Sequence, residues 1–405
     1  MKKMFKKVFF IILCILLITI QNPQYFNLNV NAASKDIYDV ILFWGQSNML
    51  GKCGKITDEF DETLPDSRYK GKNRKFTYTK YSKLTKIDKT FLSNAVQLNY
   101  VKIEQKKNSV FEYNYLSNKL VPITAKTKKL GEALEYNTDT KNKSKSKDKN
   151  TELISSKSSR NGLQRSLSTN MIPQFCKKYH EQTGHKVVVI LAANGGEPIS
   201  AFLPSESKKY KDNENKHLYE CMTIKYNAAI QYLKDSNYTI GRKLYVCAQG
   251  CQDVSLKTSK SEYIELFKKV HSSLKKDLGI TKGAIVETAY ISGLLGFSSS
   301  DSYFIRVQTI HEAQKSLIAE NKDIILGSSF IYDHYVPDKA SYESTEFKNN
   351  IYLDKGKKMP YNKALARARY VVCYPTNNSI HLTSSALCQV GDDVAVNLAE
   401  SFKKK

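Results

Sequence analysis

The 405 residues leave room for one large α/β domain with insertions or for two small domains, and composition does not decide between the two. The formal net charge of +24 predicts association with anionic polymers, such as wall polymers, acidic glycans or nucleic acid. Only eight of the 63 basic residues are arginine, which argues against specific, bidentate recognition of nucleic acid. The length of the chain excludes a disulfide-dense small scaffold, and the absence of CxxC or His-rich pairs argues against zinc.

The first 32 residues have the pattern of a secretory signal peptide. Four lysines form a positive region, residues 8–20 form an apolar core, and Val30-Asn31-Ala32 is a small-residue cleavage site. An uncleaved anchor is the alternative, but the core is shorter than the roughly 20 residues of a spanning helix. We expect export, with a mature chain of residues 33–405 that is secreted or held at the cell surface.

A nearly continuous apolar run from Ile37 to Trp44 is typical of a parallel strand that is buried on both faces. Gly45 and Gly51 bracket the turn that follows, and Ser47 lies inside it. Open α/β sheets bind ligands at the carboxyl ends of their strands, so we expect Ser47 at such a site. The alternative is that Ser47 is the N-cap of a helix.

The next hundred residues, 55–160, are rich in Lys, Asn, Tyr and Ser and show few sustained apolar periods. We interpret them as an insertion in the loop after the first strand, not as a separate domain. Within it, residues 111–115 and 120–123 predict a hairpin around Ser117-Asn118, and the polar run 139–150 predicts a mobile loop.

Helical and strand patterns alternate from about residue 164 onward. Helices are predicted within 166–182, 215–233, 263–274, 303–318 and 383–402. Strands are predicted at 186–193, 243–248, 284–291, 324–328 and 370–374. Pro173 is expected in the first turn of its helix, and Gly184 and Gly279 at helix ends. Repeated β/α units with short loops predict an α/β domain built as a three-layer, doubly wound, mainly parallel sheet.

Four loops that follow predicted strands carry unusual polar residues: Gly45–Met49, Ala193–Ile199, Ala248–Asp253 and Pro375–Thr383. A serine hydrolase needs a nucleophile, a base within hydrogen-bond reach, and donors aimed at the developing oxyanion. In these loops Ser47 can attack and His381 can take its proton.

Donors for the oxyanion are available in the same loops. The backbone N–H groups of Ser47 and Gly196 and the side-chain amide of Gln249 are the expected ones. Asn194 and Gly195 belong to the same expected binding loop, where paired glycines let a substrate carbonyl approach the main chain closely.

The motifs together resemble the sialate O-acetylesterase-like branch of the SGNH (GDSL-like) hydrolases, grouped as carbohydrate esterase family six. The family's nucleophile motif GQSNM is matched residue for residue by Gly45–Met49. Its GGTSIxxW, QGExD and DxxHLT motifs are similar to Gly195–Phe202, Gln249–Asp253 and Asn378–Thr383, and its helical RxxQ element recurs loosely as His311–Gln314. The resemblance spans residues 36–402 apart from the insertion. It implies a flavodoxin-like SGNH fold.

An activity follows from the same resemblance: hydrolysis of small acyl groups, most simply acetyl, on carbohydrate hydroxyls, with no metal or organic cofactor. Asn378 stands where a carboxylate usually orients the histidine, and Cys251 replaces the glutamate of the third motif. An asparagine can accept from the histidine Nδ1–H but does not stabilise imidazolium by charge. Asp253 and Asp333 are alternative orienting residues.

Two other functions remain open on the sequence. A glycan-binding surface protein with weakened or lost turnover would explain Asn378 and Cys251, and a polymer binder that works by charge alone would explain the lysines. The remaining histidines are expected at the surface or in the core, except that Asp333-His334 could line the pocket.

Overall fold

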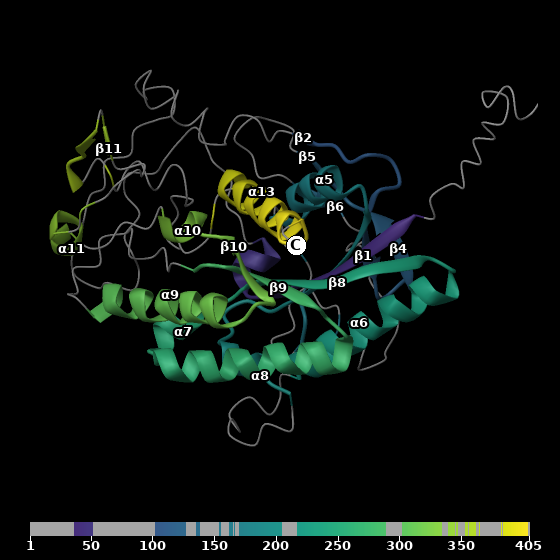
Figure 1. Ribbon diagram of the computed structural model, residues 1–405, viewed down its shortest axis with the longest axis horizontal. Coiled ribbons are helices and arrows are strands. Elements are labelled where there is room, and N and C mark those ends of the chain that lie inside the picture. Colours follow the sequence, from purple (N-terminus) through teal and green to yellow (C-terminus); the bar gives the residue numbers. More distant parts are fainter. Residues whose placement is uncertain are drawn as a thin grey trace, which may run out of the picture. The chain divides into compact units, whose positions relative to one another are not determined.

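The fold is organised around a seven-stranded sheet. In spatial order its strands are β10 (Ile324–Ser328), β9 (Lys282–Val286), β8 (Thr239–Ala248), β1 (Ile37–Gly45), β7 (Lys186–Ala193), β3 (Val110–Asn114) and β4 (Lys119–Pro122) (Figure 1). The computed structural model describes residues 36–51, 102–126, 135–137, 154, 162–164, 166, 170–204, 217–288, 302–333, 339–344, 346, 353–354, 356–361, 364, 382 and 384–403.

Strand direction is mostly parallel. β1 pairs with β7 from Tyr38↔Lys186 to Gly45↔Ala193, so the two strands end level with each other. β8 pairs with β9, β9 with β10, and β7 with β3 in parallel, whereas the edge strand β4 is antiparallel to β3. The chain passes from β7 on one side of β1 to β8 on the other, so the sheet is doubly wound and its winding reverses at β1.

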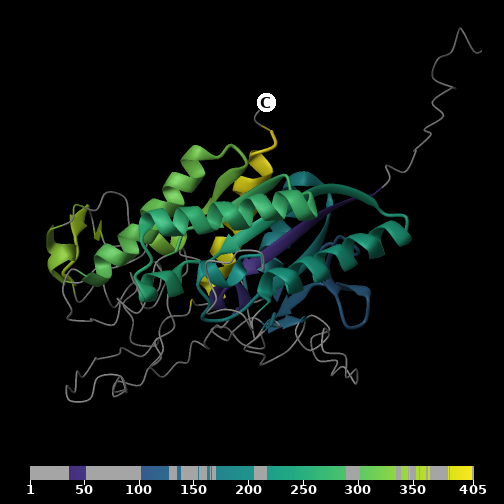
Figure 2. The same cartoon turned by 90° about the horizontal axis from the view of Figure 1, so that it is seen from below.

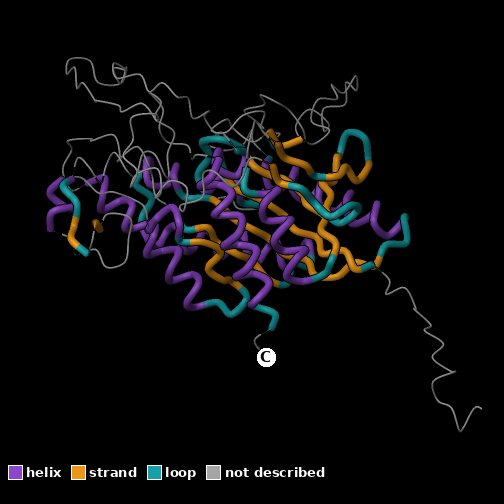
Figure 3. The backbone as a smooth tube through the Cα atoms, turned by 90° about the horizontal axis from the view of Figure 1, so that it is seen from above, coloured by secondary structure: helices purple, strands orange, loops and turns teal. Residues whose placement is uncertain are grey.

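Helices cover both faces of this sheet. α5 (Ile172–Thr183) and α13 (Ser384–Glu400) pack against each other on one face, and α6 (Leu218–Asp235), α8 (Lys260–Leu278) and α9 (Ser302–Glu320) cover the other (Figure 1). Seen from below, the second group lies across the strands (Figure 2), and the tube drawing shows helices lying over strands in the opposite view as well (Figure 3). The predicted α/β, doubly wound, mainly parallel fold is therefore confirmed.

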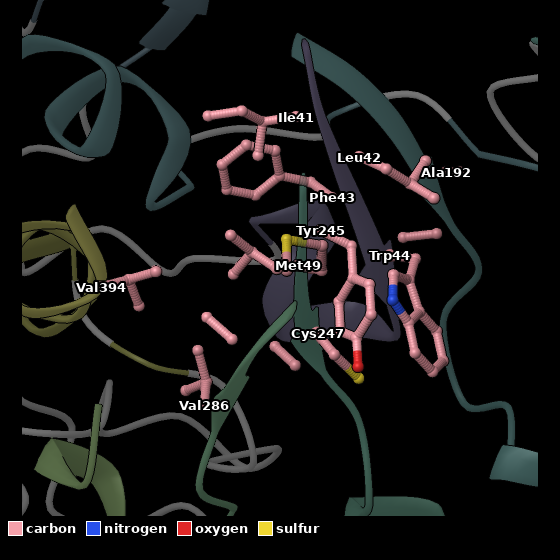
Figure 4. Packing of buried hydrophobic residues seen from close by; sticks show 14 of the residues in the cluster. Ile41, Leu42, Phe43, Trp44, Met49, Ala192, Tyr245, Cys247, Val286 and Val394 are labelled. Carbon is pink, nitrogen blue, oxygen red and sulfur yellow. The ribbon is translucent and has the colours of Figure 1, made fainter. Parts of the chain in front are cut away.

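The β1 strand is buried on both faces, as its apolar sequence predicted. Its side chains alternate, with Ile41 and Phe43 on the Val394 side and Leu42 and Trp44 on the other (Figure 4). The Phe43 ring meets Phe175 of α5 edge-on at 5.0 Å between centroids. On the opposite face three aromatic rings contact Trp44, namely Phe202, Tyr245 and Phe267. Fully burying each such side chain contributes roughly 1.5–3 kcal/mol, which fixes β1 as the centre of the core.

A buried carboxylate fixes the amino-terminal end of the sheet. Asp39 on β1 is fully buried and accepts hydrogen bonds from the Tyr179 hydroxyl (2.8 Å) and the Arg242 backbone N–H (2.7 Å). His185 Nδ1 and the Arg242 guanidinium lie 3.0 and 3.2 Å from its Oδ2. These partners compensate the desolvated charge and link β1 to β8 and to the α5–β7 loop.

Shorter elements complete the described chain. They are α2 (Ser47–Leu50), η3 (Ile199–Phe202), α7 (Cys251–Leu256), α10 (Phe330–Asp333), α11 (Lys339–Ser344), the three-stranded sheet of β2 (Lys102–Ile103), β5 (Thr124–Lys126) and β6 (Glu135–Asn137), and the pair β11 (Leu353–Asp354) and β12 (Lys357–Lys358). Ile103 and Ala125 of the small sheet pack on Cys388 of α13.

Most predicted elements are observed within a few residues of their expected ends. The predicted hairpin is β3–β4, and α5 has Pro173 in its first turn and Gly184 at its end. One expectation needs correction, because the predicted strand 284–291 ends at Val286. The predicted strand 370–374 and polar loop 139–150 lie outside the described residues. The signal-peptide and insertion boundaries stay predictions.

Candidate active site

A tight turn places Ser47 at the carboxyl end of β1. Gly45 has φ +138°, and a Cβ on it would lie 2.2 Å from the Ala248 carbonyl oxygen, so only glycine fits. The Gln46 N–H donates to that same carbonyl at 3.2 Å, and the Asn194 N–H donates to the Gly45 carbonyl at 3.0 Å. The end of β1 is thus linked to the ends of both neighbouring strands, β8 and β7.

Ser47 is the first residue of the short helix α2 and is partly exposed. Gln46, not Ser47, is the N-cap, and its carbonyl accepts from Met49 N–H (2.9 Å) and Leu50 N–H (3.1 Å). Gly51 ends the helix at φ 71°. The alternative reading of Ser47 as a helix N-cap is therefore wrong. The serine lies on the first turn, where the sheet's winding reverses and α/β proteins bind ligands.

The loop after β7 is held from outside by residues of the 162–164 segment. Asn194 is buried, and its Nδ2 donates to the Gly162 carbonyl at 2.6 Å, while the Gly195 N–H donates to Gln164 Oε1 at 3.1 Å. Gly196 has φ +79°, is exposed, and has open space where a side chain would be. Of these three predicted binding residues, Gly196 is therefore the one that presents its backbone to solvent beside the turn.

The loop after β8 is buried and polar. The Gln249 side chain is 1% exposed and donates Nε2 to the Glu197 carbonyl at 2.8 Å. The same amide also interacts with the buried Asp253 carboxylate, so an oxyanion role for Gln249 requires a rotation of its side chain. Asp253 accepts from the Ile199 N–H (3.1 Å to Oδ2) and from the Thr258 hydroxyl (3.3 Å to Oδ1), so its carboxylate holds the start of η3.

Gln46 connects the three loops. In the orientation that satisfies both amide atoms, its side chain donates to the Glu197 carbonyl at 3.3 Å and accepts from the Cys251 N–H at 3.1 Å. The residue directly before Ser47 thus contacts the loops after β7 and β8. Any shift of these loops is expected to move the Ser47 turn.

Two ionisable groups beside the turn are strongly affected by burial. Burial raises the pKa of Asp253 to about 6, and the hydrogen bonds from the Gln249 side chain, the Ile199 N–H and the Thr258 hydroxyl offset this only in part. Burial also raises the pKa of the Cys251 thiol to about 11, and its Sγ lies 2.8 Å from Thr288 Oγ1. Cys251 therefore stays protonated at neutral pH and is not a thiolate nucleophile.

The predicted base His381 and its expected partner Asn378 lie outside the described residues, as does His334. Their neighbour Leu382 is fully buried in the core. Asp333 lies on α10, is exposed, and accepts from the Ser329 hydroxyl at 2.6 Å. The described residues thus bring Ser47, Gly196 and Gln249 together on adjacent strand ends, while the roles of His381 and Asn378 remain predictions.

A buried carboxylate–imidazole pair lies near these loops, and the sequence motifs pointed only to its histidine, His311, as part of the RxxQ-like element. Glu287 follows β9 directly, and its Oε2 lies 3.1 Å from Nε2 of His311 on α9. Both side chains are buried, and the His311 ring stacks on Tyr332 with centroids 3.3 Å apart. The detectable signal was a glutamate at the carboxyl end of a buried strand. The expected continuation of that strand to residue 291 concealed it.

A family profile described as "Carbohydrate esterase, sialic acid-specific acetylesterase" matches residues 116–326, just over half of the chain. The chain belongs to this family. It is accordingly a carboxylic ester hydrolase of the carbohydrate esterase class, and an acetylated carbohydrate is the type of substrate that fits this family. The resemblance recognised in the motifs is confirmed.

Solved structures similar to the esterase share little sequence with it. A protein from Arabidopsis thaliana is 13% identical, with 90% of this chain and 98% of that chain covered and a TM-score of 0.42. NanS is 11% identical, with 92% and 98% covered and a TM-score of 0.43. A carbohydrate acetylesterase from Xanthomonas citri is 14% identical, with 82% and 54% covered and a TM-score of 0.35. Comparison with curated protein sequences returns no match.

The described part of the esterase contains no group of three or more His, Cys, Asp or Glu side chains arranged to hold a metal ion. In the same residues, no helix is long and apolar enough to cross a membrane. The five described cysteines are buried thiols: Cys176, Cys221, Cys247, Cys251 and Cys388.

Proposed function

We propose that the esterase removes O-acetyl groups from a carbohydrate by a serine–histidine mechanism, with Ser47 as nucleophile and His381 as base. The observation that carries this proposal is the position of Ser47. It lies on the first turn after the central strand, is not the helix N-cap, and is flanked by the loops of both neighbouring strands. Acyl transfer needs this convergence of a nucleophile and donors from several loops.

In the proposed reaction, Ser47 Oγ attacks the acetyl carbonyl carbon while His381 takes the hydroxyl proton. The negative charge on the carbonyl oxygen is met by the N–H groups of Ser47 and Gly196, with Gln249 as the further predicted donor. The tetrahedral intermediate expels the sugar oxygen, which receives the proton from His381. Water, activated by the same base, then hydrolyses the acetyl-enzyme and releases acetate.

The contacts of Asp253 favour Asn378 as the residue that orients His381. Asp253 is buried, and its carboxylate already interacts with Gln249, Ile199 and Thr258. Asp333 is exposed and accepts a hydrogen bond from Ser329. An asparagine Oδ1 can accept from the histidine Nδ1–H and select the reactive tautomer, although it adds no charge. In a serine protease triad, an aspartate-to-asparagine change lowers the rate by about 10⁴, so we expect slow turnover.

Acetate release from an acetylated sugar tests this proposal. Ser47→Ala should lower kcat by roughly 10²-fold or more because the acyl-enzyme can no longer form. Ser255→Ala is the matched control. It removes a hydroxyl on α7 that donates to the Cys251 carbonyl at 3.5 Å, and it should leave kcat unchanged. Equal rates for wild type and Ser47→Ala would contradict the mechanism.

We also propose that the esterase is exported and acts at an anionic surface. The lysine-led apolar core before Val30-Asn31-Ala32 supports export, and the basic composition supports contact with wall polymers. Mass spectrometry of the mature protein should give Ala33 as the first residue. An intact Met1 in protein recovered outside the cell would contradict the cleavage.

A further inference from the structure

The buried pair Glu287–His311 joins two elements that flank the active-site loops. Glu287 follows β9, and His311 lies on α9, with Nε2 of the histidine 3.1 Å from Oε2 of the glutamate. The two residues are 5% and 8% exposed. The Tyr332 ring covers the imidazole at an interplanar angle of 12°, so the histidine is held in place from a third element, α10.

Burying a carboxylate is strongly unfavourable unless a partner compensates the lost hydration. Replacing a buried pair by apolar residues is often neutral or stabilising, so such a pair is weak evidence for a role in stability. What the pair does supply is a fixed geometry between its two elements. Here the Glu287–His311 pair fixes the segment that follows β9 relative to helix α9.

That segment contacts the loop after β8 directly. The N–H of Thr288, the residue after Glu287, donates to Gln314 Oε1 at 3.0 Å, and Gln314 Nε2 donates to the Gln249 carbonyl at 2.9 Å. Thr288 Oγ1 lies 2.8 Å from Cys251 Sγ. Gln314 is one turn after His311 on the same helix, so the pair and these hydrogen bonds share one rigid support.

Gly250 lets the loop after β8 lie close to Thr288 and to α9. It has φ +131°, and a Cβ there would lie 2.7 Å from Thr288 Cγ2 and 3.0 Å from Ile310 Cγ2. The next residue, Cys251, donates its N–H to Gln46, which precedes Ser47. A continuous set of contacts therefore runs from Glu287 through Thr288 and Cys251 to the nucleophile turn.

We propose that Glu287 and His311 form a positioning pair that holds the loop after β8, and through Gln46 the Ser47 turn, in its reactive geometry. The pair does not touch substrate. The inference rests on the proposed role of Ser47. Breaking the pair is expected to reduce the rate of acylation without changing how the sugar binds, because a misplacement of about 1 Å at the reacting atoms can cost about 10²-fold in rate.

Four variants test the pair by acetate release and by the rate of Ser47 labelling with a fluorophosphonate. Glu287→Gln keeps the shape of the side chain but replaces its carboxylate with an amide. His311→Phe keeps an aromatic ring against Tyr332 but removes the ring nitrogen that faces Glu287. Each should lower kcat and the labelling rate about 10- to 100-fold, with KM within twofold. The double variant should be no slower than the slower single variant, because both changes break the same interaction. His311→Gln retains a donor for Glu287 and should keep kcat within about threefold of wild type.

Glu320→Gln is the matched control, because it breaks the exposed pair that links α9 to Lys268 of α8. It should leave kcat unchanged. Three results would overturn the inference. The first is a wild-type kcat in folded Glu287→Gln and His311→Phe. The others are losses of kcat that multiply in the double variant, and equal losses in His311→Gln and His311→Phe. Full activity of Ser47→Ala would instead overturn the proposed function, so the two failures are distinguishable.

Discussion

Burial disfavours the ionised form of the Asp253 carboxylate. Burial raises its pKa from 3.8 to about 6, so the folded protein binds this proton more tightly than the unfolded chain does. At pH values between these two pKa values, Asp253 is protonated more often in the native state than in the unfolded chain. The contribution of Asp253 to the free energy of unfolding therefore falls as the pH rises from about 4 to about 6, and it stays low above that window.

Asp253→Asn should remove this pH dependence while keeping an oxygen for Ile199 N–H. Relative to wild type, the variant should gain about 2 kcal/mol in its free energy of unfolding when the pH is raised from 4 to 7. Urea denaturation at the two pH values measures the difference. A difference between variant and wild type that does not change with pH would contradict the assignment.

The position of Ser47 was predictable from residues close to it in sequence, because an apolar run and two glycines specify a strand followed by a tight turn. The contacts of Asn194 and Gln249 were not predictable. Their amides bind Gly162 and Glu197, which are 32 and 52 residues away, and no local pattern encodes these pairings. The Glu287–His311 pair depends in the same way on how β9 and α9 meet.

The placement of the Ser47 turn depends on how closely the carboxyl ends of strands β1 and β8 approach each other. Their close approach brings the Ala248 carbonyl to the Gln46 N–H and leaves no room for a side chain at Gly45. A Cβ at Gly45 would force the two strand ends apart in a backbone conformation that L residues rarely adopt. The contact therefore controls both stability and the placement of the Ser47 turn.

Gly45→Ala should lower the free energy of unfolding by about 3 kcal/mol or more and lower activity as well. Gly184→Ala is the matched control, because Gly184 also has a positive φ (+69°) but nothing within 4 Å of a Cβ, so it should cost only about 1 kcal/mol. Chemical denaturation of both variants measures the two costs. Equal costs would show that the contact with Ala248 is unimportant.

Long amphipathic helices such as α6 and α8 were predictable because their apolar residues repeat over many turns. The short elements η3 and α7 were not, since four to six residues give too few repeats for a periodic signal. The turn at Ser117-Asn118 predicted the β3–β4 hairpin, and Asn118 has φ +47°. That β3 pairs in parallel with β7 is a non-local contact, which the hairpin sequence does not specify.

At the scale of the whole molecule, 63 basic residues stand against 39 acidic ones, so ion pairs cannot remove the net positive charge. Several lysines of α8 bind carboxylates on or near it, including Lys268 with Glu320 and Lys269 with Glu265. Exposed pairs of this kind contribute roughly 0–1 kcal/mol each. The excess of lysine over acidic residues remains, and it supports the proposed contact with anionic polymers.

The esterase should be retained on an anionic polysaccharide column at low ionic strength and released in 1 M salt, where the Debye length is about 3 Å. A neutral polysaccharide column should not retain it by charge and serves as the control. Elution across a salt gradient is the measurement. Retention on the anionic column that persists in 1 M salt would contradict binding by charge alone.

The most direct test of the nucleophile is peptide mapping after reaction with a fluorophosphonate. The reagent transfers its phosphonyl group, with loss of fluoride, to a serine that is activated by a base and supported by oxyanion donors. We predict one phosphonylated peptide, which contains Gly45–Met49 and carries the modification on Ser47, with acetate release lost in parallel. An unmodified Ser47 in protein that still releases acetate, or modification at another serine, would contradict the account.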